Sequence, residues 1–483
     1  MSQPLLIAVG QGGIAPSGTF LHSAVSTLNK HAQSSSSSST SSSSSPLPTP
    51  SPHPLLPLFL RSLPTSPLAL FLDSESKLAS TLPPLDPRHV VTSHTGFGGN
   101  WCRGFFTCSP SETTKGTSMA DRKGVTVASP PPPSRPDWNS SNGPTRRAAL
   151  ASPDTLLERS MTSVYDITRS SSSHSPFFVA HSLTGGTGSG FTSRLLTELK
   201  DEYPKRSVYT YSLTPFVSDV GDDWRVTDSC GPVWAYNALL ALEYLDEFAD
   251  AVFLRSNADL LNEARAAKAT KGRTAASTPV TVSDVNTRIA ADFKGLLHPG
   301  FNLDRVLSDV VVPGDKYASV ASSVAVSPRV SSLGEALESQ AKFCSANVRR
   351  RDAEGRAVTT RAAHVVCRGY GSDALTAENK KAVYKVLNRG YQFDHQGISS
   401  GSPPLDEAVM NYTASPQGGK AVTVASLRSD AASYARHVIT RANGLYEVGA
   451  YLRYFEELGK EDWAEAFERA WGIVERVEEV FDL

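Results

Sequence analysis

The 483-residue chain has few cysteines, almost no net charge and no long apolar run. Its five cysteines show no paired metal-ligand spacing, and their odd number gives no disulfide framework, which favours a reducing compartment such as the cytoplasm. The 47 lysines and arginines nearly balance the 48 aspartates and glutamates. This balance argues against nucleic acid, or an acidic membrane, as a partner that is bound mainly through charge.

Membrane-directed segments are also missing from the sequence. No apolar stretch reaches the roughly 20 residues that a membrane-spanning helix needs. The apolar run at residues 5–9 has no basic segment before it and ends at Gly10, so a signal peptide is not predicted. We therefore expect a protein without membrane insertion, and the chain length predicts two or three domains.

Short apolar runs recur along the chain, and each is closed by glycine or polar residues. They lie at residues 5–9, 68–72, 177–180, 207–211 and 251–254. Runs of this length are typical of strands that are buried on both faces of a parallel sheet, and helical patterns separate the later ones. The alternation predicts an α/β fold built on a parallel sheet.

Two stretches of low complexity interrupt this pattern, at about residues 33–55 and 109–144. The first is nearly pure serine before it becomes rich in proline, and the second mixes serine with proline. Such compositions cannot bury enough apolar surface to offset the chain entropy lost on folding. Both stretches are predicted to be disordered insertions in surface loops that carry no chemistry.

The second half of the chain begins with a long helical pattern. Its apolar residues recur at helical spacing and are Val282, Val285, Ile289, Phe293 and Leu297. This pattern predicts a core helix at residues 281–298. Residues 299–425 mix strand-like with helical stretches and are predicted to form an α+β domain, whereas residues 426–483 are strongly helical. A last amphipathic helix is expected after Gly459, through Trp463, Phe467, Trp471, Val474 and Val477.

A glycine-rich string follows the strand predicted at residues 177–180 and opens a helix. It reads Thr184, Gly185, Gly186, Thr187, Gly188, Ser189, Gly190. Glycines let backbone amides approach a phosphate, and a helix N-terminus adds positive potential. A glycine-rich turn in this position is often purely structural, but the string GGTGSG is far rarer than GxGxxG. The string is therefore a candidate phosphate-binding loop.

The string GGTGSG matches the signature of the tubulin family, in which such a loop holds the nucleotide phosphates, and other segments resemble family loops in the same order. Residues 10–13 are similar to the first phosphate loop, so the resemblance implies that Gln11 and Gly12 contact the nucleotide. Residues 73–75 resemble the acidic loop that helps to hold Mg²⁺ through water, which implies roles for Asp73 and Glu75. Taken alone, this acidic tripeptide is better explained as a solvated loop.

Residues 96–101 resemble the loop that wraps the terminal phosphate, which implies Gly98 and Asn100 as contacts. Gly99 stands where the family usually has a second asparagine.

Two further asparagines match the family positions that read guanine. Tyr236-Asn237 begins a helix as in tubulins, and counting onward without a gap places Asn257 on the first position. Asn286 falls on the second position. An amide suits guanine because it offers both a donor and an acceptor to the base edge. Val282 replaces the aromatic residue that stacks on the base in most tubulins.

The resemblance covers most of the chain outside the insertions. It implies a Rossmann-like GTP-binding domain at residues 1–280, followed by the core helix, an α+β intermediate domain and a C-terminal helical hairpin. It also implies GTP and Mg²⁺ as cofactors, other tubulins as partners and a place in the cytoplasmic cytoskeleton. Residues 283–286 are most similar to the δ-tubulin pattern. The same holds for residues 450–483, which have no long acidic tail. That pattern implies a role at centrioles and basal bodies and in cilium assembly.

Hydrolysis of GTP is a separate question. In polymerising tubulins an acidic residue from the start of the second domain of the next subunit orients the attacking water. The matching stretch here, residues 300–309, has Val306 or Leu307 where the acid is expected, and Asp309 is a weak substitute. We predict GTP binding with weak or partner-dependent hydrolysis, and no catalytic residue from this chain.

Two other functions stay open. Residues 10–15 fit the GxGxxA pattern of an NAD-dependent oxidoreductase, but a serine run occupies the region where the acidic residue is expected about 20 positions later. This alternative also leaves residues 184–190 unexplained. A degenerate tubulin fold that binds no nucleotide and acts only as a scaffold is kept open by Gly99 and Val282.

Overall fold

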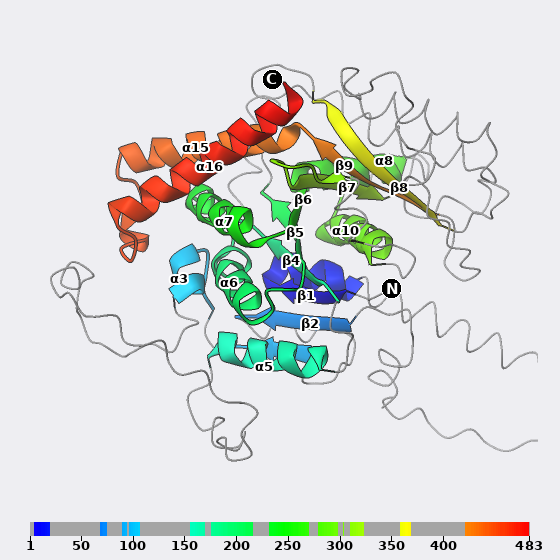
Figure 1. Ribbon diagram of the computed structural model, residues 1–483, viewed down its shortest axis with the longest axis horizontal. Coiled ribbons are helices and arrows are strands. Elements are labelled where there is room, and N and C mark those ends of the chain that lie inside the picture. Colours follow the sequence, from blue (N-terminus) through cyan, green and yellow to red (C-terminus); the bar gives the residue numbers. More distant parts are fainter. Residues whose placement is uncertain are drawn as a thin grey trace, which may run out of the picture.

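The computed structural model describes residues 4–19, 68–74, 89–93, 96–106, 155–169, 175–215, 231–269, 279–297, 303, 310–322, 358–368 and 421–482. Figure 1 shows a central twisted sheet with helices on both faces and a pair of C-terminal helices against one side. The predicted insertions at residues 33–55 and 109–144 lie outside the described residues.

Within the described residues, nine strands form one sheet in the order β3-β2-β1-β4-β5-β6-β7-β9-β8. Neighbouring strands from β3 through β7 are parallel, whereas β9 runs antiparallel to both β7 and β8. The predicted α/β fold with a parallel sheet is therefore confirmed. The strands are β1 (Leu5–Val9), β2 (Leu68–Asp73), β3 (Val90–Thr92), β4 (Phe177–Ser182), β5 (Val208–Thr214), β6 (Ala251–Ser256), β7 (Tyr317–Ser322), β8 (Thr360–Arg368) and β9 (Ala421–Arg428).

The strand order reverses between β1 and β4. The chain moves outward from β1 to β2 and β3, and then returns to build β4, β5 and β6 on the other side of β1. In open α/β sheets, ligands bind outside the carboxyl ends of the strands at such a switch point. The loops that begin at Gly10 and Leu183 leave the carboxyl ends of β1 and β4, so both glycine-rich segments lie at this point.

Helices cover both faces of the sheet (Figure 1). On one side, α6 packs against α3 and α7, and α7 packs in turn against α15 and α16; α8 and α10 pack against each other near β6, β7 and β9. None of the helices among the described residues is long and apolar enough to span a membrane. The helices are α3 (Trp101–Phe106), α5 (Leu156–Thr168), α6 (Thr192–Glu202), α7 (Trp234–Phe248), α8 (Asn257–Ala269), α10 (Val282–Leu296), α15 (Asp430–Glu447) and α16 (Lys460–Phe481); residues 10–19 are also helical.

The core helix predicted at residues 281–298 corresponds to α10. Thr281 accepts a hydrogen bond from the backbone amide of Asp284, and the Asp284 carboxylate accepts one from the backbone amide of Thr281. This capping box satisfies amides that have no partner inside the helix. Val285, Ile289 and Phe293 are buried as the helical spacing predicts, but Val282 in the first turn is 73% exposed.

The strands that were predicted to belong to an α+β domain join the first sheet. β7 pairs with β6 through two residue pairs, Val252 with Tyr317 and Phe253 with Ala318. β9 and β8 then extend the sheet beyond β7. The domain limits at residues 280 and 425 stay predictions.

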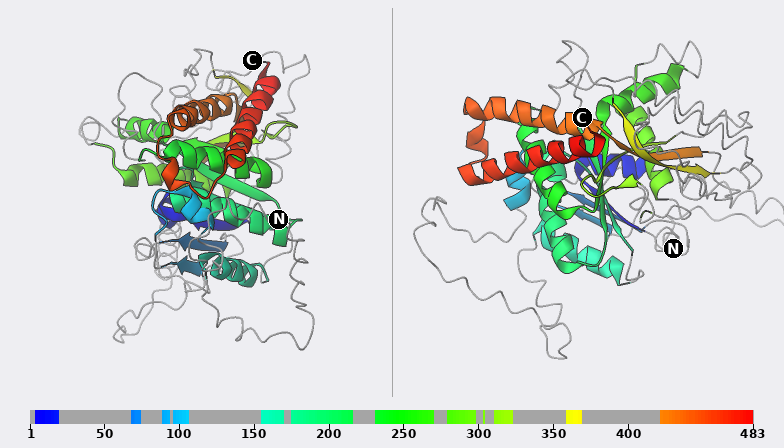
Figure 2. Two further views of the ribbon diagram at one scale, coloured as in Figure 1. Left: turned by 90° about the vertical axis from the view of Figure 1, so that its left-hand side faces the viewer. Right: turned by 45° about the horizontal axis from the view of Figure 1, so that its top comes forward.

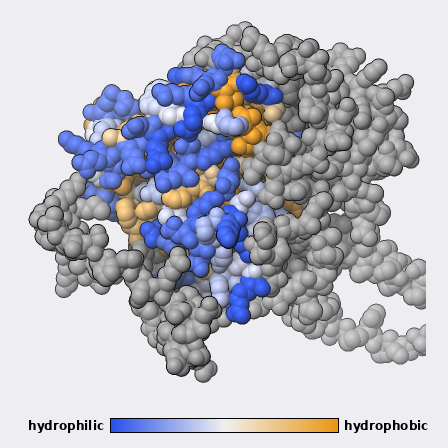
Figure 3. Space-filling model, viewed as in Figure 1, coloured by the Kyte–Doolittle hydropathy of each residue, from blue (hydrophilic) through white to orange (hydrophobic). Residues whose placement is uncertain are grey.

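The C-terminal helices α15 and α16 lie side by side as a hairpin (Figure 2), joined by a segment that contains the short helix η7 (Leu452–Tyr454). Their surface is largely hydrophilic in the view of Figure 3. The buried face of α16 consists of Trp463, Ala466, Ala470, Ile473, Val474, Val477 and Phe481.

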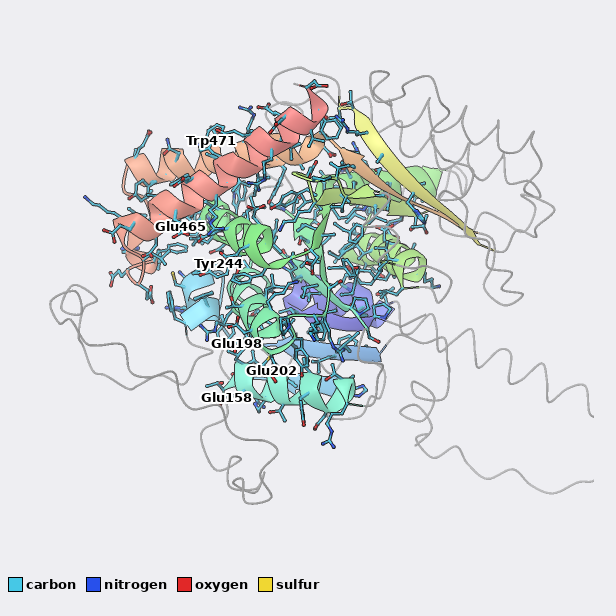
Figure 4. All side chains as sticks on the ribbon, viewed as in Figure 1. Glu158, Glu198, Glu202, Tyr244, Glu465 and Trp471 are labelled. Carbon is cyan, nitrogen blue, oxygen red and sulfur yellow. The ribbon has the colours of Figure 1, made fainter. Side chains whose placement is uncertain are left out.

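The prediction that Trp471 belongs to the apolar face of α16 is wrong. Trp471 is 41% exposed, and its ring lies against the Arg436 guanidinium of α15, 5.6 Å from the ring centroid. Figure 4 labels Trp471 on α16. At about 100° per residue, a step of eight residues from Trp463 turns the side chain by roughly 80° away from the buried face.

These two tryptophans of α16 give a test of the packing. Trp463 packs edge-on against Tyr236 at a centroid distance of 4.8 Å and contacts Phe455 at 5.7 Å. Replacement Trp463→Ala is expected to lower the free energy of unfolding by about 3–5 kcal/mol, because it leaves a cavity. Trp471→Ala, the matched control, should cost less than about 1 kcal/mol. Denaturant unfolding followed by circular dichroism measures both, and equal losses would contradict the packing described.

Candidate functional site

The loops after β1 and β4 lie so close together that a side chain would hardly fit between their backbones. Gly10 has a φ of +62°, and a Cβ built on it would lie 3.2 Å from the Gly188 nitrogen. A Cβ on Gly13 would lie 2.1 Å from the Ala180 carbonyl oxygen, which no side chain can tolerate. The glycines of the first loop therefore let the helix that starts at Gly10 pack directly on β4.

The glycine-rich segment after β4 forms a π-helical turn, η4 (Thr187–Phe191), that continues into α6. The Ser189 backbone amide and hydroxyl both donate to the Gly185 carbonyl, at 2.8 Å and 2.7 Å. Amides that precede Ser189 in this turn lie at the start of the helix and point toward its N-terminus, where the helix dipole favours an anion. This arrangement suits a phosphate group. The side chains behind it, Phe191, Leu195, Leu196 and Leu199, are fully buried.

The loop of residues 96–100 lies against the β4 loop. Gly98, in the left-handed region with a φ of +59°, accepts a 2.9 Å hydrogen bond from the Gly186 amide through its carbonyl oxygen. A Cβ on Gly186 would lie 2.6 Å from the Asn100 carbonyl oxygen and 2.7 Å from that of Gly98. A phosphate that binds the Gly186 amide must therefore displace the Gly98 carbonyl.

Asn100 is engaged with protein groups in this structure. Its Oδ1 accepts from the Arg103 amide at 2.9 Å, so the side chain caps the first turn of α3. Its Nδ2 donates to the Tyr454 carbonyl at 2.5 Å, which ties the loop to the segment between α15 and α16. The side chain that resembles a terminal-phosphate contact thus joins two helical elements.

Asn237 is the most important site residue that sequence reasoning missed. It is fully buried in the first turn of α7. Its Oδ1 accepts from the Trp101 amide at 2.9 Å, and its Nδ2 donates to the Gly99 and Thr184 carbonyls, both at 2.7 Å. One amide therefore holds the loop of residues 96–100 against the start of the β4 loop. The similarity of Tyr236-Asn237 to the start of a tubulin helix was the sequence feature that could have identified this residue.

The acidic loop reaches the site through Ser74, which was also missed. The Ser74 hydroxyl lies 2.7 Å from the Thr187 hydroxyl and accepts from the Phe97 amide at 3.3 Å. Asp73 ends β2 beside it and is 6% exposed, while Glu75 lies outside the described residues.

The donor groups at the site decide whether a magnesium ion would fit there. Among the residues that the structure describes, no three acidic, histidine or cysteine side chains gather at one point. Mg²⁺ in nucleotide sites commonly takes one or two carboxylates and completes its shell with phosphate oxygens and water. Asp73 beside the glycine loops fits that mode of binding.

The amides implied to read a base are available for a ligand. Asn257 is the first residue of α8, at the carboxyl end of β6, and Asn286 lies near the start of α10. Both are partly exposed, and Gln11 after β1 is exposed. None of these three amide side chains is hydrogen-bonded to another residue in the described part of the chain.

His181 anchors the β4 loop to the sheet. Its Nδ1 lies 2.7 Å from the Gly188 carbonyl and its Nε2 lies 2.8 Å from the Ser212 hydroxyl. Burial lowers the pKa of His181 to about 4, so the ring is neutral at pH 7. The neutral ring donates from Nδ1 to Gly188 and accepts at Nε2 from Ser212.

Because His181 is buried in its neutral form, the folded protein is expected to lose stability in acid. The unfolded chain binds a proton at His181 below a pKa of about 6.5 and the folded chain only below about 4. Its contribution to stability is therefore present above pH 6.5 and lost as the pH falls toward 4, by an amount on the order of 3 kcal/mol. In His181→Gln, the unfolding free energy should depend less steeply on pH between 6.5 and 4. Identical slopes in urea titrations of the two proteins would contradict the assignment.

Comparisons with known proteins agree with this geometry. Residues 147–265 match the model of the Tubulin/FtsZ family, GTPase domain. This span contains the β4 loop, Asn237 and Asn257. A tubulin beta-2 chain of Geotrichum candidum is 29% identical over 177 residues, which cover 35% of this chain and 26% of that protein. The chain thus spans about a quarter of the length of this relative. The α/β sheet and the glycine loop at its switch point accord with the similarity of residues 147–265 to the GTPase domain of the Tubulin/FtsZ family.

Proposed function

We propose that this chain is a GTP-binding structural protein of the tubulin family that assembles with other tubulins. The proposal rests chiefly on one observation: two glycine-rich loops meet at the switch point of a parallel sheet, within or beside the region that matches the GTPase domain. The NAD-dependent alternative uses only the first of these loops. It gives no role to the turn at residues 187–191.

In the proposed complex, the phosphates rest on the first amides of η4, with Gln11 and Gly12 on the opposite side. The loop of residues 96–100 closes over the terminal phosphate once Gly98 releases the Gly186 amide. Asp73 and Glu75 would hold Mg²⁺ through water, and the bound ion would neutralise phosphate charge.

The guanine base is proposed to lie between α8 and α10. Asn257 and Asn286 each offer an amide donor and acceptor, which suits the edge of guanine. Val282 is 73% exposed at the start of α10 and supplies a small apolar surface beside the base. Base recognition in this proposal depends mainly on the two amides.

A specific observation favours a second candidate, the scaffold that binds no nucleotide. The Gly98 carbonyl already occupies the Gly186 amide, so the loops satisfy each other without a ligand. Identification of the bound ligand separates the two candidates.

The first test combines ligand identification with Gly186→Asp. The purified protein is denatured, and the released small molecule is identified by chromatography; guanine nucleotide is expected. Gly186→Asp places a side chain and a negative charge against the phosphate position, so at least a tenfold loss of bound GTP is expected. Gly444→Asp is the matched control, because a Cβ at Gly444 in α15 meets no atom within 4 Å.

Three results would overturn the proposal. Recovery of NAD would favour the oxidoreductase. An empty site that takes up no added GTP would favour the scaffold. Full GTP retention in Gly186→Asp would refute the assignment of the loop.

The finer proposal is a δ-type tubulin that acts in the cytoplasmic cytoskeleton at centrioles and basal bodies, in cilium assembly. It rests on the resemblance of residues 283–286 and of the C-terminal segment to the δ pattern. Hydrolysis is proposed to be weak or partner-dependent, because residues 300–309 have no glutamate in the expected position.

This finer assignment predicts a location. A fluorescently tagged chain in ciliated cells should concentrate at basal bodies, at least severalfold above its level along cytoplasmic microtubules. A tagged β-tubulin in the same cells is the control and should label both structures. Uniform incorporation of the tagged chain along microtubules would contradict the δ assignment while leaving GTP binding intact.

A further inference from the structure

Four charged side chains are buried together between α8, α10 and the sheet. Arg255 is the last residue but one of β6, Glu263 lies on α8, and Arg288 and Asp292 lie on α10. Each is at most 5% exposed. The two positive and two negative groups balance, and we name them the ion network.

Hydrogen bonds join the residues of the ion network on β6, α8 and α10 to each other and to two further strands, β5 and β7. Arg255 donates from Nε to Asp292 at 3.0 Å and from Nη2 to Glu263 at 2.8 Å. Arg288 donates from Nη2 to Glu263 at 3.3 Å and to the Ser322 carbonyl of β7 at 3.0 Å. The Tyr211 hydroxyl of β5 donates to Asp292 at 2.8 Å. The bonds thus run from the sheet through α10 to α8.

Stability alone does not account for the ion network. Removing four charges from water costs several kcal/mol per ion, and apolar side chains of similar volume often stabilise a core equally well. In addition, Asp292 Oδ1 is buried and has no hydrogen-bond partner among the described residues. The directional bonds instead fix how α8 and α10 lie relative to each other, whereas apolar contacts tolerate small shifts.

The residues of the ion network are close in the chain to both amides that are proposed to read the base. Arg255 precedes Asn257 by two residues, and Arg288 follows Asn286 by two residues on α10. Each asparagine is therefore attached to an arginine of the network by a short stretch of chain. Glu263 accepts hydrogen bonds from both arginines and links the two sides.

We propose that Arg255, Glu263, Arg288 and Asp292 are positioning residues that set the separation of Asn257 and Asn286, and thereby the selectivity of the site for guanine. This inference rests on the proposed function, because it requires the two asparagines to contact the base. The network itself does not touch the nucleotide in this proposal. A shift between α8 and α10 would change base discrimination more than phosphate binding.

The test compares nucleotides that differ only in the base. The variant R255M/E263L/R288M/D292L replaces both partners of every ion pair within the network with apolar groups, so folding is expected. The dissociation constants of GTP and of ITP, which lacks the 2-amino group of guanine, are measured for both proteins. We expect GTP binding to weaken about tenfold in the variant and ITP binding to change less than about threefold. The preference for GTP over ITP then falls.

The matched control removes another ion pair. R436M/E478L breaks the pair between α15 and α16, which lies in the C-terminal hairpin. Its stability can change, but its preference for GTP over ITP should equal that of the unmodified protein. A change in this control would show that the ratio reports general destabilisation and would overturn the inference.

The remaining outcomes are distinct. If the fourfold variant keeps the unmodified ratio, or loses GTP and ITP equally, the network supports only the fold and the inference is wrong. If the fourfold variant does not fold, Arg288→Lys decides, since it keeps the charge but not the guanidinium geometry, and an unchanged ratio refutes positioning. If the unmodified protein binds no GTP, the proposed function itself has failed.

Discussion

The close approach of the β1 and β4 loops is the constraint on which the site depends. The first turn after β1 lies so near β4 that a Cβ at Gly13 would overlap the Ala180 carbonyl, and Gly10 adopts a left-handed conformation to start that turn. Because β1 and β4 are adjacent and parallel, their carboxyl ends bring both loops to the switch point of the sheet. The buried His181 then fixes the second loop to the sheet through Gly188. The sheet thereby brings together the backbone amides at the start of the two helices that follow β1 and β4, without the help of a ligand.

The sequence predicted the parts of this site that are local in the chain. The strands at residues 5–9 and 177–180 were visible because strands buried on both faces are continuously apolar, and the β4 loop was visible as a rare glycine string. Asn237 and Ser74 were not found, since their roles come from partners that are distant in the sequence: Trp101 lies 136 positions from Asn237, and Thr187 lies 113 positions from Ser74. No local pattern distinguishes such an asparagine from an ordinary residue of a first helical turn.

The same reasoning explains the other differences between sequence and structure. Residues 299–425, which contain β7, β8 and most of β9, were predicted to form the strands and helices of an α+β domain. A strand pattern in the sequence does not specify which sheet the strand joins. The charged residues of α10 carry no sign of burial, because Arg288 and Asp292 are buried only through Arg255 and Glu263 on other elements. The apolar spacing of α16 predicted that Trp471 lies on the buried face. Trp471 instead lies at the surface, where the guanidinium of Arg436 packs against its ring. Tertiary contacts decide each of these positions.

The hydrogen bonds of the site also extend to the C-terminal hairpin. Asn100 binds the Tyr454 carbonyl, and the Tyr236 hydroxyl, next to Asn237, donates to the Ala450 carbonyl at 3.0 Å. Both acceptors lie in the segment that joins α15 to α16. A ligand that takes the Gly186 amide must displace the Gly98 carbonyl, which lies two residues from Asn100 on the same short loop. Because Asn237 holds Gly99 between these two points, the displacement occurs in a loop whose last residues are tied to α7 through Gly99 and to the hairpin through Asn100. The arrangement of the phosphate loop and that of the C-terminal hairpin are therefore not independent.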